Sequence, residues 1–160
     1  MRAFRGGYTA KVDEKGRLKL PSAFKDLLDE EHVTKFYITS EDGDKAQVWP
    51  LPTWEKREAK LADDSNMNVA VDKYLELTSF YGHEVEIDPQ GRVLLPQKLR
   101  GKAKLEAEVS VSGKLEFLQV ENMQRVDERI PGMTLTAENR QTLAAILKQK
   151  DQKAVPPGDA

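Results

Sequence analysis

The sequence predicts a mixed α+β protein, mainly β, that is built from two similar halves. The first indication is a repeated stretch, because residues 13–21 read DEKGRLKLP and residues 88–96 read DPQGRVLLP. The second is the alternation of apolar and polar residues around each glycine, which is typical of half-buried strands. The third is the proline that closes each stretch and can open a helix. Together they predict two β-hairpins, each followed by a short helix.

The two stretches match closely enough to indicate an internal duplication. Residues 13–25 and 88–100 share five identities and three conservative matches in thirteen positions. The identical pairs are Asp13 and Asp88, Gly16 and Gly91, Arg17 and Arg92, Leu20 and Leu95, and Pro21 and Pro96. Because the turn residue, the charged pair and the proline recur together, chance is a poor explanation.

Each copy is expected to form a strand, a tight turn and a second strand. Gly16 and Gly91 stand where such a turn requires positive φ. After Pro21, apolar residues at 24, 27 and 28 have helical spacing. In the second copy, Gly101 is expected to shorten the corresponding helix.

The two halves continue in parallel beyond the hairpins. The further elements expected are a strand, turn and strand over 36–49 and over 109–120, polar helices over 53–61 and 121–130, a linker over 63–66 and a connecting helix over 69–80. Trp49 and Trp54 are expected to pack in the core.

This order predicts a first module over 1–66, a second over 67–132 and a C-terminal extension over 133–160. In the extension, Thr136 is a suitable N-cap for one short amphipathic helix. The last ten residues, DQKAVPPGDA, have the composition of a disordered tail.

The charge distribution is uneven although the formal net charge is only −2. Residues 1–25 carry seven basic and two acidic side chains, and residues 88–104 carry five and one. The segment between them, 26–87, carries six basic and fifteen acidic side chains. Positive charge is therefore concentrated in the two segments that hold the repeat. This is expected of a protein that binds an anionic partner such as nucleic acid.

The composition indicates a cytoplasmic protein that is not attached to a membrane. The chain has no cysteine, which excludes disulfides, zinc–thiolate sites and a cysteine nucleophile. It has no apolar run of the roughly 18 residues that a membrane helix needs. The N-terminal MRAFRGG has too few apolar residues for a signal peptide.

Catalytic chemistry is not expected. The two histidines, His32 and His83, have no partner in the repeat. The metal, nucleophile and phosphate-loop motifs of common enzymes do not occur. The sequence therefore predicts no enzyme activity, no metal or other cofactor and no small-molecule substrate.

The repeated loop is the strongest candidate site. Arg17 and Arg92, each on a short braced turn, are suited to bond guanine or to hold a phosphate. Lys15 and Lys19 are expected to contact DNA with them, as is Gln90, which takes the place of Lys15 in the second copy. The expected loop-bracing residues are Asp13, Gly16, Asp88 and Gly91. The structural alternative is a glycine turn that an Asp–Arg pair merely ties down.

The residues around both loops resemble one known family. FRGGYTAKVDEKGRLKLPSAFK resembles the opening of the MraZ family, within the SpoVT/AbrB-like regulators, and FYGHEVEIDPQGRVLLPQKLR resembles the second module of that family. The shared signature is a doubled Asp-x-x-x-Arg motif. The resemblance covers roughly residues 4–130.

This resemblance implies a fold, an assembly and a function. The fold would be two AbrB-like swapped-hairpin modules related by internal pseudo-symmetry, assembled into a ring, an octamer or a dodecamer. The function would be sequence-specific recognition of G-rich repeats in double-stranded DNA, upstream of the division and cell-wall gene cluster. The arginine loops would face the DNA, and the protein would be nucleoid-associated. Because Pro89 and Gln90 replace a basic residue, the second loop is expected to contact DNA less strongly.

Two other functions stay open. An AbrB-like antitoxin would bind both DNA and a toxin, with the extension 133–160 as the toxin-binding segment. A structural oligomer without a nucleic-acid role would use Arg17 and Arg92 only for stability.

Overall fold

The computed structural model of the protein describes residues 2–64 and 68–154. The chain divides into two compact units, Met1–Asp127 and Glu128–Ala160. Within the described residues there are eight strands, six α-helices and one 3-10 helix.

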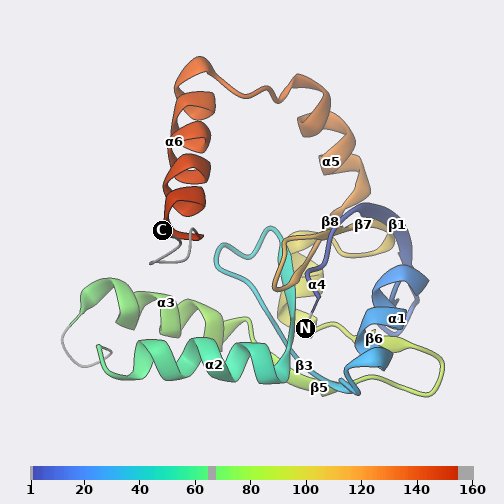
Figure 1. Cartoon of the computed structure of the whole chain (residues 1–160). Coiled ribbons are helices and arrows are strands. Elements are labelled where there is room, and N and C mark those ends of the chain that lie inside the picture. The colour runs from blue at the N-terminus through green and yellow to red at the C-terminus, as the bar shows by residue number, and fades with distance from the viewer. Residues whose placement is uncertain (1, 65–67, 155–160) are drawn as a thin grey trace. The chain divides into compact units, whose positions relative to one another are not determined.

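The first unit contains the sheet and the helices that pack on it (Figure 1). Its strands are β1 (Gly7–Val12), β2 (Arg17–Lys19), β3 (Lys35–Thr39), β4 (Ala46–Pro50), β5 (His83–Glu86), β6 (Arg92–Leu94), β7 (Ala107–Gly113) and β8 (Leu118–Asn122). Its helices are α1 (Ser22–Glu30), α2 (Leu51–Ala62), α3 (Val69–Phe80), α4 (Gln97–Ala103) and the start of α5 (Met123–Arg129). The mixed α+β, mainly β class is therefore confirmed.

The eight strands form one antiparallel sheet in the order β5-β3-β4-β8-β7-β1-β2-β6. Its two end strands, β5 and β6, follow each other along the chain and belong to one hairpin, so the sheet is nearly closed into a barrel. β1 pairs with β7 from Gly7 opposite Ser112 to Val12 opposite Ala107. β5 pairs with β3 from Lys35 opposite Glu86 to Ile38 opposite His83. The first strand of each repeated hairpin thus pairs with a strand from the other half of the chain.

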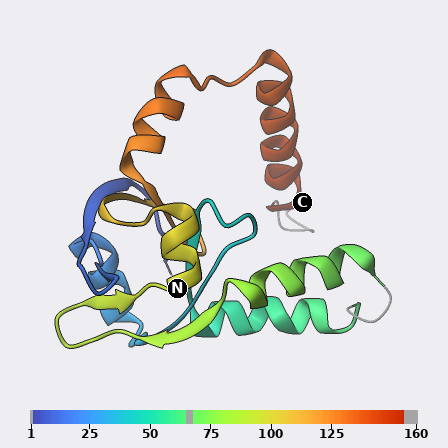
Figure 2. The same ribbon diagram turned by 180° about the vertical axis from the view of Figure 1, so that it is seen from behind.

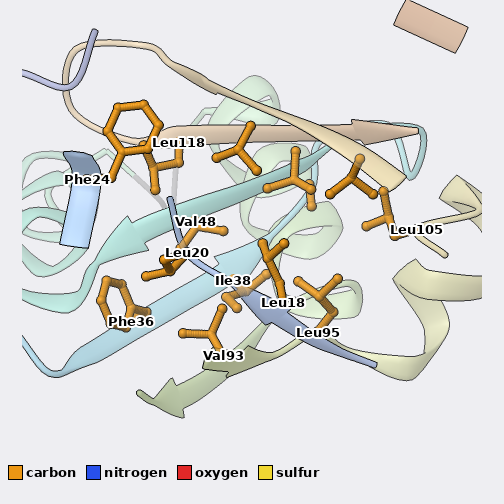
Figure 3. Close-up of a cluster of buried hydrophobic side chains, with 14 of the residues drawn as sticks. Leu18, Leu20, Phe24, Phe36, Ile38, Val48, Val93, Leu95, Leu105 and Leu118 are labelled. Carbon is orange, nitrogen blue, oxygen red and sulfur yellow. The ribbon is translucent and has the colours of Figure 1, made fainter. Parts of the chain in front are cut away.

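The remaining cross-half pairs are β2 with β6 and β4 with β8. Leu18 lies opposite Val93, and both side chains are fully buried. Leu20, Leu95 and Phe24 extend this cluster (Figure 3). These three residues and Leu99 are at most 3% exposed. Complete burial of one leucine side chain stabilises a fold by about 1.5–3 kcal/mol. The matching apolar residues of the two copies therefore build one core.

The helices follow the expected pattern with small shifts. The connecting helix over 69–80 is confirmed as α3. α4, with seven residues, is shorter than α1, with nine. It continues past Gly101 to Ala103, and the C-cap residue Lys104 adopts the left-handed conformation (φ 51°). The helix predicted over 121–130 begins at Met123, because residues 121 and 122 belong to β8.

An aromatic cluster packs α2 and α3 against β3 and β4. The rings of Trp49 and Phe117 stack with centroids 4.6 Å apart, and those of Trp54 and Tyr37 stack at 4.8 Å. Arg57 on α2 donates a 2.9 Å hydrogen bond to the hydroxyl of Tyr74 on α3. The two helices lie side by side in both views (Figures 1 and 2). Trp49 and Trp54 are both buried, so their predicted packing role is confirmed.

The second unit consists of the end of α5, the 3-10 helix Ile130–Gly132 and α6 (Ala137–Ala154). Thr136 is confirmed as the N-cap, since its Oγ1 accepts a 3.0 Å hydrogen bond from the Asn139 amide. The prediction of a short helix was wrong, because α6 has 18 residues. Residues 151–154, predicted disordered, are helical, and 155–160 lie outside the described residues. No helix in the described part of the chain is long and apolar enough to cross a membrane.

Candidate functional site

The first repeated turn is held by the carboxylate and the carbonyl of Asp13. Its Oδ1 accepts hydrogen bonds from the backbone amides of Lys15 at 3.0 Å and Arg17 at 2.9 Å. The carbonyl accepts the Gly16 amide at 2.9 Å. Gly16 adopts φ 83°, a conformation that favours glycine because it has no Cβ. The turn is thus fixed by one side chain and one glycine.

The same carboxylate also holds the arginine. Nε of Arg17 lies 2.7 Å from Oδ2 of Asp13. The Arg17 side chain keeps 33% of its surface exposed. Since Nε is the bonded atom, the guanidinium is oriented while its outer nitrogens remain available to a ligand.

The second turn repeats these contacts. Oδ1 of Asp88 accepts the amides of Gln90 and Arg92, both at 2.9 Å. Its Oδ2 accepts Nε of Arg92 at 2.9 Å, and Gly91 adopts φ 77°. Asp88 and Gly91 thus form the second turn in the same way as Asp13 and Gly16 form the first.

The hydrogen bonds lower the pKa of both aspartates. For Asp13 the largest cause is the bond from the Arg17 backbone amide, with the Arg17 guanidinium adding to it against a smaller effect of burial. For Asp88 the corresponding bond from Arg92 is the largest cause. Both carboxylates are therefore ionised at neutral pH and keep the charge that orients the arginines.

The two turns are joined through the β2–β6 pair. The Leu20 amide donates to the Gly91 carbonyl at 3.0 Å, and the Leu95 amide donates to the Gly16 carbonyl at 2.9 Å. Because Leu18 and Val93 point into the core, their neighbours Arg17, Lys19 and Arg92 lie on the opposite face. The two arginine loops therefore share one rigid scaffold and one outer surface.

Side-chain contacts also connect the loops. Nη1 of Arg92 lies 3.6 Å from Oδ2 of Asp13, and Nζ of Lys19 donates to the backbone carbonyl of Gln90. The structure thus brings Asp13 to both arginines and Lys19 to the second loop. The Lys15 and Gln90 side chains are exposed, each on its own loop.

Two basic residues beside the loops were missing from the predicted site. The Arg100 side chain lies directly over Gly16, so that a Cβ there would be 1.9 Å from its Nη1. Lys25 lies beside Gly91, where a Cβ would be 3.6 Å from its Cε. The available signal was the repeat itself, because Lys25 and Arg100 occupy matching positions and are both basic.

The described residues show no arrangement for metal chemistry, since they contain no group of three or more His, Asp or Glu side chains placed to hold a metal ion. The site is instead a pair of matching hairpin loops that each present a carboxylate-held arginine on one face of an antiparallel sheet. This defines a protein with a doubled arginine-loop surface.

Comparison with known proteins identifies the family. Residues 3–76 and 81–125 match the family described as "MraZ protein, putative antitoxin-like". A protein of Acidobacterium capsulatum named "Transcriptional regulator MraZ" is 48% identical over 141 residues, which cover 88% of this chain and 97% of that protein. Proteins of the same name from Koribacter versatilis and Thiobacillus denitrificans are 39% and 32% identical, covering 88% and 79% of this chain and 97% and 86% of theirs. The chain belongs to the MraZ family.

Proposed function

We propose that this chain is a transcriptional regulator that binds double-stranded DNA in a sequence-specific manner through Arg17 and Arg92. The observation that carries the proposal is the Nε–carboxylate contact of each arginine, at 2.7 Å and 2.9 Å, on one shared surface. A guanidinium held in this way can bond O6 and N7 of guanine together, or clamp one phosphate. The name of the relatives, "Transcriptional regulator MraZ", supports the same function.

The DNA target, the cellular location and the assembly that we propose follow the family resemblance. The target would be G-rich repeats upstream of the division and cell-wall gene cluster, and the protein would act in the cytoplasm at the nucleoid, without enzyme activity. A homo-oligomeric ring would present several identical loops to repeated DNA elements, which raises the effective concentration of every contact after the first. Sedimentation of the purified chain tests for the ring, and a variant that stays monomeric yet binds DNA equally well would contradict this mechanism.

We also infer that the modules over 1–66 and 67–132 are related by an internal two-fold axis. The reciprocal pairing supports this inference, since β1 joins β7 while β5 joins β3. The boundary at residue 66 lies outside the described residues.

The test is a salt titration of binding to a duplex from the region upstream of the gene, with wild type, Arg17→Ala and Arg92→Ala. Loss of a base contact should cost about 1–3 kcal/mol and relax the sequence preference, while loss of a phosphate contact should reduce the salt slope by about one. Arg140→Ala, at an exposed arginine of α6, is the matched control. If neither arginine variant differs from this control, the site assignment is wrong.

An antitoxin is the second candidate, which the words "antitoxin-like" in the family description favour. It predicts a stoichiometric complex with a small toxic protein of the same genome, and relief of that toxicity by this chain. A structural oligomer predicts instead that Arg17→Ala lowers the melting temperature while DNA affinity is unaffected.

A further inference from the structure

Each arginine loop borders an open groove in the first unit. Groove 1, of about 790 Å³, is lined by Thr9–Lys11, Lys19–Ser22, Lys25 and Pro89–Gly91. Groove 2, of about 750 Å³, is lined by Val12–Glu14, Gly16, Gln97, Arg100, Gly101 and Leu105–Ala107. Groove 1 thus lies beside the second loop and groove 2 beside the first.

The two grooves differ in charge. The ionisable residues that line groove 1 are Lys11, Lys19 and Lys25, without a carboxylate. Groove 2 is lined by Asp13, Glu14 and Glu106, with Arg100 as its basic residue. Two sites of similar volume and similar position in the repeat therefore attract opposite kinds of ligand.

Two lysines of groove 1, Lys19 and Lys25, lie beside the second loop. Lys19 donates to the Gln90 carbonyl, and a Cβ on Gly91 would lie 3.8 Å from Lys19 Nζ and 3.6 Å from Lys25 Cε. Lys25 is also paired with Asp29 at 2.6 Å, outside the groove lining, which offsets part of its charge. Lys11 stands opposite Glu108 on β7.

The first turn of α1 adds the positive end of a helix dipole to groove 1, and its N-cap residue Pro21 makes no side-chain capping bond.

We propose that groove 1 is a phosphate-binding site, one in each chain, which holds a backbone phosphate of DNA, and that groove 2 is not. This inference rests on the proposed DNA-binding function. It gives the two loops different tasks: the first carries its own Lys15, while the second receives positive charge from Lys11, Lys19 and Lys25 of the other half. The absence of a basic residue at Gln90 then does not weaken the second loop.

The test compares two triple variants with the same change in net charge. Lys11→Gln, Lys19→Gln and Lys25→Gln together remove the charge of groove 1. Lys56→Gln, Lys60→Gln and Lys114→Gln together remove three exposed lysines elsewhere in the first unit. In a salt titration with the upstream duplex, the groove variant should lose about one unit of slope for each chain that contacts the duplex, because one neutralised phosphate contributes about 0.9. The control variant should keep the wild-type slope.

Equal slopes for the two variants would overturn the inference while leaving the proposed function intact. Failure of the wild type to bind any duplex would instead contradict the proposed function. If inorganic phosphate stabilises the wild type but not the groove variant, and the duplex slopes are equal, the site binds free phosphate and the assignment to DNA is wrong. Lys19→Gln alone, with an expected slope loss of up to about one for each bound chain, replaces the triple variant if circular dichroism shows that the latter is unfolded.

Discussion

Asp13 has a contact that its counterpart in the repeat lacks. Both Asp13 and Asp88 bind the arginine of their own turn, but Oδ2 of Asp13 also lies 3.6 Å from Nη1 of Arg92. Asp13 therefore helps to position both arginines. The repeated sequence does not reveal this difference, because the backbone amides of Arg17 and Arg92 make equivalent hydrogen bonds in the two turns.

The variants Asp13→Asn and Asp88→Asn are a matched pair that tests this asymmetry. Each keeps one amide oxygen for the backbone but loses the negative charge that orients an arginine. We expect Asp13→Asn to weaken binding to the upstream duplex more strongly, by about 1.4 kcal/mol or tenfold beyond Asp88→Asn. Fluorescence anisotropy measures both affinities. Equal losses would show that the longer contact does not position Arg92.

The same carboxylates make the stability depend on pH. Their pKa values are lowered in the folded protein, chiefly by the backbone amides of Arg17 and Arg92. This contribution is therefore fully present above the unfolded-state pKa of about 3.9 and is lost as the pH falls through the lower folded-state value. The melting temperature of wild type should fall below pH 4. Asp13→Asn/Asp88→Asn should show a shallower fall, and an identical pH profile would contradict this origin.

At the scale of the elements, the two hairpin turns differ in how closely a side chain packs over the turn glycine. Gly16 and Gly91 share a positive φ, yet only Gly16 is in close contact with a side chain, that of Arg100. Gly91→Ala should lower the free energy of unfolding by about 1–2 kcal/mol, the strain of a Cβ at positive φ. Gly16→Ala should lower it further, because its Cβ must displace Arg100. Urea denaturation checks the order, and equal values would mean that Arg100 moves without penalty.

Helix α6 contributes no residue to the core. The buried apolar residues in the described part of the chain all lie between Phe4 and Val120, while Leu143, Ile146 and Leu147 of α6 are 46–64% exposed. Deletion of residues 133–160 should therefore change the melting temperature by no more than about 2 °C. Calorimetry and sedimentation measure the outcome. A larger drop, or a smaller particle on sedimentation, would show that these three side chains are covered by another surface.

Local features of the elements were predictable from the sequence, and long-range contacts were not. The turn glycines, the aspartate braces and helix α3 follow from spacing and residue type within a few positions. The pairing of β1 with β7, the position of Arg100 over Gly16 and the contact of Lys19 with Gln90 join residues more than 70 positions apart. Nothing in the local pattern of either partner encodes such a contact. Residues 151–154 were misjudged because their polar composition also suits an exposed helix.

At the scale of the whole molecule, neither half can complete its own sheet. A fragment of residues 1–64 would retain the pairing of β1 with β2 and that of β3 with β4. It would lose every pairing with β5, β6, β7 and β8. Isolated two-stranded hairpins are marginally stable at best. The module proposed over 1–66, expressed alone, should be unfolded or form a dimer, while the sheet of the full chain should unfold in a single transition. Circular dichroism and sedimentation test this, and a folded monomer would contradict it.

The pairing of Gly7 with Ser112 has a consequence during synthesis. A ribosome adds about 5–20 residues each second, so β1 waits on the order of ten seconds for β7 to emerge. Until then one edge of β1 is open, and β7 of a neighbouring nascent chain on the same messenger RNA offers an identical partner. We expect the rate of translation between these two strands to decide whether the sheet closes within one chain or between two.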